Sequence, residues 1–176
     1  DYNHTHQKNI RKVFNKFTKT KLSKKNFSLD GCSAPQYSFK IKSISKALNN
    51  LIKSYKDCYD YSEEVKTLIN SVLENPEFIG GTSSFDTKVM KASKGKIFCK
   101  SGAEGVFLFI HIQKEISGVV KIIDGNERAI PISILNIFKK LKIMSRVELK
   151  ILKEIETFDL QNHAGRKIGH ISLTMK

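Results

Sequence analysis

Apolar residues recur with helical spacing through the N-terminal half of the chain. An amphipathic helix is expected first, because apolar side chains fall at positions i, i+3, i+4 and i+7. These side chains are Ile10, Val13, Phe14 and Phe17. The same spacing predicts helices over 41–55 and 62–73, the second of which should end before Pro76. A short strand is expected at 27–29, where an apolar segment meets a turn.

From residue 96 onward the apolar residues alternate or form short continuous runs separated by glycine. This pattern predicts three consecutive antiparallel strands. They are expected over 96–101, 106–113 and 118–123. A helix should follow Pro131, and a last strand should cover 167–174. We therefore predict an α+β fold, with helices packed on an antiparallel sheet, and treat residues 1–176 as one domain.

The chain is strongly basic, with 31 Lys or Arg and 17 Asp or Glu among 176 residues and a net charge of +14. Such a charge invites a nucleic-acid interpretation. Only four of these residues are Arg, the preferred reader of phosphates and base edges, so we do not expect nucleic-acid binding. A basic module that binds nucleic acid or an acidic protein is kept as the alternative. The lysines of 16–25 form either a solvated helix end or an anionic contact surface.

Three cysteines at scattered positions do not suggest a disulfide framework, so we expect a reducing, cytoplasmic compartment. No apolar run approaches the roughly 20 residues of a membrane span, and no membrane partner is expected. Cys58 and Cys99 are predicted to lie in the core. Cys32 sits in a tight polar turn, and it is either a metal ligand or reactive thiol or simply a buried small side chain.

The strongest candidate for chemistry is Lys100, which ends an apolar strand in the run 98–105. A lysine inside a strand is costly unless its charge is used. Followed by Ser101 and Gly102, it forms a Lys-Ser-Gly signature known from the serine β-lactamase and penicillin-binding fold. Glu104, between two glycines, is expected to be buried and to pair with Lys100. The alternative is an edge-strand lysine that blocks strand pairing.

Two Ser-x-x-Lys pairs occur, and this spacing can place a nucleophile beside its base on a helix. They are Ser43 with Lys46 and Ser93 with Lys96. The first falls on the polar flank of a predicted helix and the second ends at a glycine turn. We expect neither pair to be catalytic.

Several short motifs, in this order and at these gaps, resemble the bacterial L-asparaginase II family, which has a serine β-lactamase-like fold and differs from the classical two-domain bacterial asparaginases. The motifs are Asp30-Gly31-Cys32-x-Ala34-Pro35, Asn75-Pro76-Glu77-Phe78-Ile79-Gly80-Gly81, Phe85-Asp86-Thr87-x-x-Met90 and Lys100-Ser101-Gly102-Ala103-Glu104-Gly105-Val106. Ser84 departs from the family pattern, which has a basic residue there.

The resemblance implies a role for each matching residue. Lys100 corresponds to the lysine that carries a proton together with a second serine. Cys32 corresponds to a zinc ligand that acts with an upstream cysteine and lysine. The substrate-binding residues that we expect are Asp30, Ser101, Gly102 and Glu104.

The implied activity is hydrolysis of L-asparagine to aspartate and ammonia by a Lys-activated serine. The family's nucleophilic Ser-x-x-Lys, its second serine and its Cys-x-x-Lys segment have no counterpart in these residues. The matching motifs therefore represent the C-terminal half of the family, and we expect this chain alone to be inactive or nearly so. A non-catalytic or partner-dependent half-domain is the alternative, and a homodimer is the family expectation.

Overall fold

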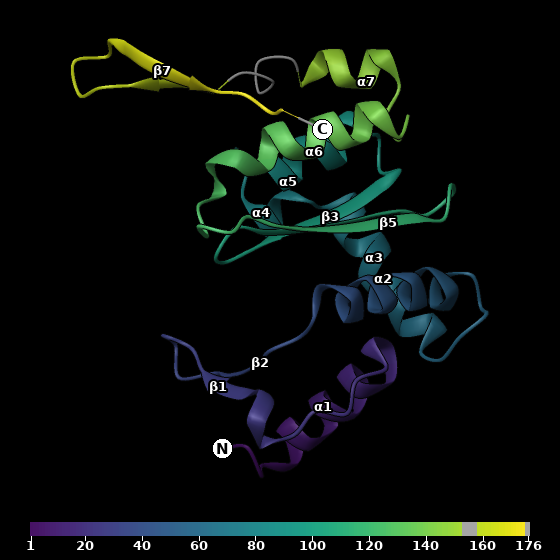
Figure 1. Cartoon of the computed structure of the whole chain (residues 1–176). Helices are drawn as coiled ribbons and strands as arrows, with labels where there is room; N and C mark the ends of the chain where they lie inside the picture. Colours follow the sequence, from purple (N-terminus) through teal and green to yellow (C-terminus); the bar gives the residue numbers. More distant parts are fainter. Residues whose placement is uncertain (153–157, 175–176) are drawn as a thin grey trace. The chain divides into compact units, whose positions relative to one another are not determined.

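The computed structural model describes residues 1–152 and 158–174, which form an α+β structure, as predicted (Figure 1). The chain divides into two compact units, Asp1–Lys66 and Thr67–Lys176. Each unit is described by itself. None of the helices in the described part of the chain combines the length and the apolar character that crossing a membrane requires.

The first unit is mainly helical. Its elements are α1 (Thr5–Thr18), the 3-10 helix η1 (Lys24–Asn26), β1 (Phe27–Leu29), β2 (Pro35–Tyr37), α2 (Ile41–Tyr55) and the start of α3 (Ser62–Glu74). The predicted helices and the strand at 27–29 are confirmed. The end of α1 is fixed to α2 because the buried Asn50 side chain donates a hydrogen bond to the Phe17 carbonyl, at 2.7 Å.

The second unit contains the three-stranded sheet. After α3 come α4 (Glu77–Gly80), α5 (Phe85–Ala92), β3 (Ile97–Gly102), β4 (Val106–His111), β5 (Ile116–Lys121), the 3-10 helix η2 (Glu127–Ala129), α6 (Ile130–Lys140), α7 (Arg146–Ile151), β6 (Phe158–Gln161) and β7 (Lys167–Ile171). The strands β3, β4 and β5 form the predicted antiparallel meander. The predicted last strand is also present as β7, although its partner β6 was not foreseen.

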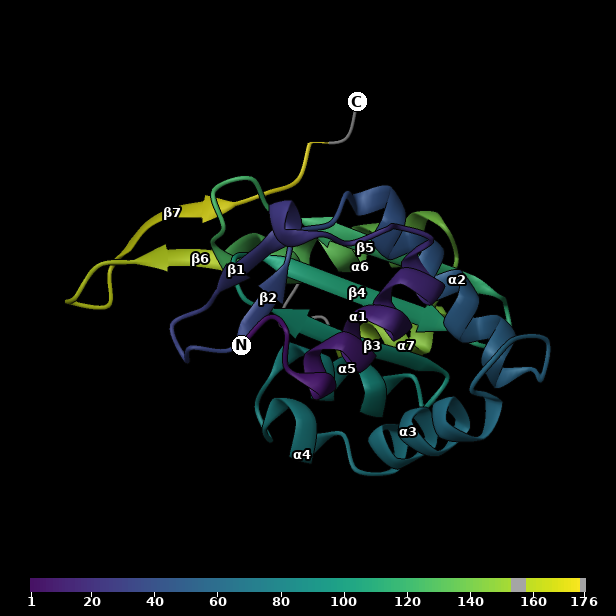
Figure 2. The ribbon, with the colours of Figure 1, turned by 90° about the horizontal axis from the view of Figure 1, so that it is seen from below.

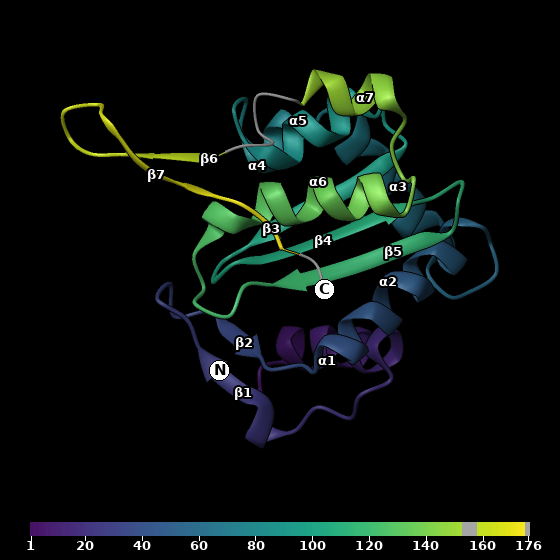
Figure 3. The same ribbon diagram turned by 45° about the horizontal axis from the view of Figure 1, so that its top comes forward.

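The core of the second unit lies between this sheet and the helices α5 and α6. Figure 3 shows α6 running along the sheet, and Figure 2 shows β4 between β3 and β5. In β3 and the first part of β4 alternate residues are buried, among them Ile97, Cys99, Phe107 and Phe109, as period-two patterning predicts. Phe109 of β4 meets Phe138 of α6 edge to face, with ring centroids 4.9 Å apart. This packing holds the position of β3, the strand that carries Lys100.

Candidate functional site

A cavity of about 300 Å³ opens beside the end of β3. It is lined by Ile79, Gly80, Ser84, Phe85, Asp86, Lys100, Ser101, Glu127, Ile130 and Pro131. Three segments far apart in the sequence therefore contribute to its wall: the turn before α5, the end of β3 and the start of α6. Lys100 is the one cation among these lining residues, and Asp86 and Glu127 are the two acids.

Asp86 organises this cavity, although the sequence did not single it out as a site residue. Its side chain is only 3% exposed, and it lies in the first turn of α5, where a helix favours negative charge. The carboxylate accepts hydrogen bonds from the Ser101 amide at 2.7 Å and from the Ser101 hydroxyl at 2.5 Å. The Lys100 ammonium lies 3.5 Å from the same carboxylate. Asp86 thus ties α5 to the end of β3.

Burial by itself would raise the pKa of Asp86. The hydrogen bonds from Ser101 and the nearby charge of Lys100 oppose this effect and leave the pKa below its usual value. Asp86 is therefore ionised at neutral pH. Because the Ser101 hydroxyl donates its hydrogen bond to Asp86, its oxygen is available to accept a hydrogen bond from a ligand.

The prediction that Lys100 pairs with a buried Glu104 was wrong. Glu104 is exposed, not buried, and it occupies a turn with a positive φ of 61°. The acid that faces Lys100 comes from α5 instead. Neither Gly102 nor Glu104 lines the cavity. In the described sheet β3 is an edge strand, so the structure also agrees with the alternative that Lys100 protects an edge.

Ser84 could have indicated this site. It accepts a hydrogen bond from the Thr87 amide at 3.2 Å and caps α5, which fixes the helix start at Phe85, one residue before Asp86. A cap followed by an acid in the first turn is a readable helix signal. What the sequence lacks is any sign that this helix start meets the end of β3.

The Asp30 and Cys32 motif lies in the first unit, in the loop between β1 and β2. Asp30 accepts hydrogen bonds from the amides of Cys32 and Ala34, both at 2.9 Å, and from the Gln36 side chain at 3.0 Å. The bond from Ala34 contributes most to the lowered pKa of Asp30. This carboxylate therefore holds the loop in shape, and it leaves the Cys32 thiol exposed.

A zinc ion would need ligands beyond this loop. Within the described parts of the chain, no group of three or more His, Cys, Asp or Glu side chains is placed to hold a metal. Cys32 could supply one thiolate, whereas zinc sites in proteins usually have four ligands or three and a water. The residues present here do not by themselves fit a zinc site.

The other cysteines differ in burial. Cys99 is buried in the core, as predicted, and burial raises its pKa well above the usual value. Cys58 is exposed, so its predicted core position is wrong. It follows the end of α2 in a polar turn, where the nearby tyrosines that suggested a core do not cover it.

Neither Ser-x-x-Lys pair forms a nucleophile with its base. The Ser43 hydroxyl accepts a hydrogen bond from Thr20 at 2.9 Å, and Lys46 is exposed. Ser93 is buried and donates to the Met90 carbonyl at 3.0 Å. The lysine of that second pair bonds to Glu148, at 2.9 Å.

The comparisons with known proteins agree with the motifs. No curated protein sequence matches this chain. The family model described as L-asparaginase II matches residues 1–173, which is nearly the whole sequence. This chain belongs to the L-asparaginase II family.

Proposed function

We propose that this chain contributes to the hydrolysis of L-asparagine to aspartate and ammonia. Family membership supports the reaction class. The observation that carries the proposal is the cavity at the end of β3, where Lys100, Ser101 and Asp86 converge. At about 300 Å³ it lies at the small end of ligand pockets, which suits an amino acid.

The lining of this cavity also offers an acid to an amino acid. Glu127 can bind the ammonium group of the substrate, while Lys100 is kept for proton transfer. The Ser101 hydroxyl donates its hydrogen bond to Asp86, so its oxygen can accept a hydrogen bond from an N–H of the substrate. Asp86 acts through these two neighbours and is a positioning residue.

In the proposed reaction a serine oxygen attacks the side-chain amide carbon, and the C–N bond then breaks to release ammonia. The base that activates the serine takes its hydroxyl proton, and Lys100 gives one proton to the departing nitrogen through a serine partner. Water then attacks the acyl ester: one water proton goes to Lys100, the base returns its proton to the serine, and the product leaves as aspartate, its acid proton passing to the released ammonia. General acid–base catalysis of this kind typically contributes about 10²–10⁴-fold in rate.

The nucleophile of this scheme is proposed to lie outside these 176 residues. The two Ser-x-x-Lys pairs of this chain support that view, because each serine and each lysine has a structural role or an exposed position. We likewise propose zinc binding only if further ligands come from outside the chain. If it binds, the Cys32 thiolate is the group that this loop can offer.

The first test is ammonia release from L-asparagine by the complete native polypeptide that contains these residues. Lys100→Met should lower kcat by about 10²-fold or more, because the proposed proton carrier is lost. Lys88→Met is the matched control, since this exposed lysine of α5 does not line the cavity. Lys100→Met with unchanged kcat would contradict the role of Lys100.

Ser101→Ala separates substrate binding from nucleophilic catalysis. If Ser101 only binds substrate, its loss should raise KM by about tenfold, as expected for one hydrogen bond to a charged group, and change kcat little. A complete loss of kcat with normal folding would identify Ser101 as the nucleophile. That result would overturn the proposal of a nucleophile from outside the chain.

A further inference from the structure

A second and larger cavity of the same unit lies at the other end of β3. Its volume is about 610 Å³, within the usual range of small-molecule sites. It is lined by Lys96, His111, Gln113, Lys114, Lys139, Lys142, Ile143, Met144, Ser145, Arg146, Glu148 and Leu149. It shares none of these residues with the cavity at Lys100. Lys96 and Lys100 are four residues apart, about 13 Å along an extended chain.

The lining of this cavity is strongly cationic. Four lysines and one arginine face one carboxylate, Glu148. Burial alone would raise the pKa of Glu148, but the ion pair with Lys96 at 2.9 Å and the hydrogen bonds from Ser145 lower it to about 2. Glu148 therefore cancels one positive charge at neutral pH, and four remain.

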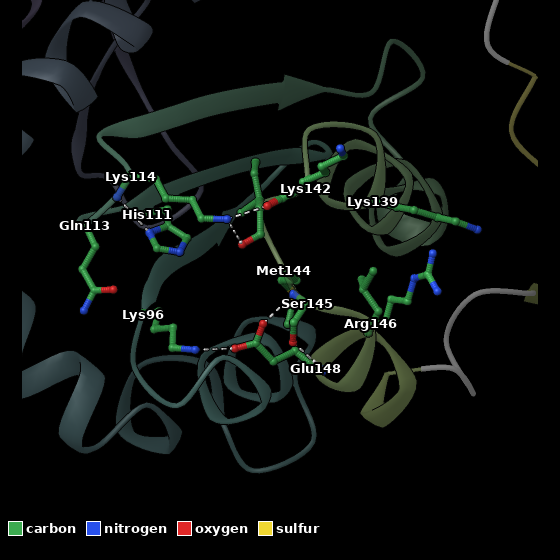
Figure 4. Close-up of a pocket in the computed structure, with 12 residues that line it drawn as sticks. Lys96, His111, Gln113, Lys114, Lys139, Lys142, Met144, Ser145, Arg146 and Glu148 are labelled. Atoms are coloured by element: carbon green, nitrogen blue, oxygen red, sulfur yellow. Dashed lines mark hydrogen bonds and ion pairs between the residues drawn. The ribbon is translucent and has the colours of Figure 1, made fainter.

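A buried histidine lies between two of the lysines. The His111 Nδ1 accepts a hydrogen bond from the Lys114 amide at 3.3 Å. Burial and the charge of Lys114 lower the pKa of His111, so its ring is neutral and carries its proton on Nε2. Figure 4 shows an ammonium group on either side of this ring: that of Lys114, which donates to the Lys142 and Ile143 carbonyls, and that of Lys96, which pairs with Glu148. An N–H donor between two ammonium groups is suited to an oxyanion.

The other cations form a separate group on the far side of the cavity (Figure 4). Lys139, Lys142 and Arg146 come from the end of α6, the following turn and the start of α7. No carboxylate of the described residues forms an ion pair with any of these three side chains. Met144 and Leu149 add apolar surface between the two groups of cations.

We propose that this cavity binds a small organic molecule that carries two or more phosphate charges. One phosphate lies at Lys96, His111 and Lys114, and the second cation group neutralises the rest of the charge. Inorganic phosphate alone would fill little of the volume, and the apolar surface is suited to an organic part of the ligand. The site does not depend on the proposed hydrolase activity.

The test is titration of the protein with ATP, pyrophosphate and inorganic phosphate at constant ionic strength, followed by calorimetry. ATP should bind saturably and more tightly than inorganic phosphate. The double variant Lys139→Met/Arg146→Met should weaken ATP binding at least tenfold. Both side chains are exposed, so folding should survive, and thermal unfolding checks this. The charge-matched control is Lys88→Met/Lys121→Met, which should bind ATP within about twofold of the native protein.

Equal weakening in both double variants would overturn the proposal, because the binding would then reflect net charge alone. Absence of saturable binding by ATP and pyrophosphate would overturn it as well, and so would tight binding of an RNA oligonucleotide with no binding of ATP. A change in the NMR signal of the His111 ring on addition of ATP would support the site directly. Asparaginase assays test the cavity at Lys100, whereas ATP titration tests the cavity at His111. Either proposal can therefore be contradicted without affecting the other.

Discussion

Asp86 shows how one buried carboxylate can define a site. Its carboxylate accepts two hydrogen bonds from Ser101 and pairs with the Lys100 ammonium, and both residues lie near the end of β3. A buried charge is tolerated only when it is paired in this way. The sequence predicted roles for Lys100 and Ser101, and both line the cavity, but it assigned the partner of Lys100 to Glu104. Glu104 was predicted because it is close to Lys100 in the sequence, whereas the fold places Asp86 of α5 beside Lys100.

The lowered pKa of Asp86 predicts how stability depends on pH. Since the folded pKa lies below the unfolded value of 3.8, ionised Asp86 stabilises the fold above that pH, and this contribution is lost as pH falls through the folded pKa. Asp86→Asn should cost about 1–3 kcal/mol at pH 7. In urea unfolding, the difference from the native protein should shrink below about pH 4.

Glu64→Gln, at an exposed position of α3, is the control for that experiment and should change stability by less than about 0.5 kcal/mol. A difference between Asp86→Asn and the native protein that stays constant from pH 7 to pH 3 would show that the charge of Asp86 does not contribute.

At the scale of elements, the structure explains why the turn between β3 and β4 contains a glycine. Gly105, in the turn between β3 and β4, has a φ of +67°. A Cβ atom there would lie 2.9 Å from the Ile122 Cβ and 3.1 Å from the Gly125 carbonyl group. The Ile122 amide also donates to the Gly105 carbonyl, at 2.8 Å. Gly105 thus allows the β3–β4 turn to approach the loop that leads to α6.

Gly105→Ala should therefore destabilise the protein by about 1–3 kcal/mol, since it adds both a left-handed backbone penalty and a steric clash. Urea unfolding measures this loss. Gly102→Ala, at the last residue of β3, is the control: its Cβ would meet the Val106 Cβ at an ordinary 3.5 Å. Equal stability of the two variants would mean that the loop moves aside at no cost.

Elements whose hydrophobic pattern was long were predicted well. The helices α1, α2 and α3 and the β3–β4–β5 meander are confirmed, and no end whose position was predicted shifts by more than two residues. The short strands β2 and β6 were not predicted. Each has three or four residues and pairs with a single partner, so too few apolar positions repeat to reveal a period.

For the whole molecule, the cysteines give a simple test of burial. Cys32 and Cys58 are exposed and lie in the first unit, whereas Cys99 lies in the core of the second. A chromogenic disulfide reagent should therefore label two thiols rapidly in the native protein. The third should react only when the second unit unfolds, because burial excludes the reagent and raises the pKa of Cys99.

In the same experiment Cys32→Ser should reduce the rapid count from two to one, while Cys99→Ala should leave it at two. Rapid labelling of three thiols in the native protein would contradict the buried position of Cys99.

The sequence by itself determined the fold class, the sheet meander and the family, because these depend on local periodicity and on motifs of contiguous residues. Only the tertiary structure decided that Asp86 is the partner of Lys100, that Glu104 is exposed, and that five cations line one cavity together with His111. Those facts arise from side chains 14 to 52 residues apart in the sequence. Long-range packing brings them together, and no local pattern records it.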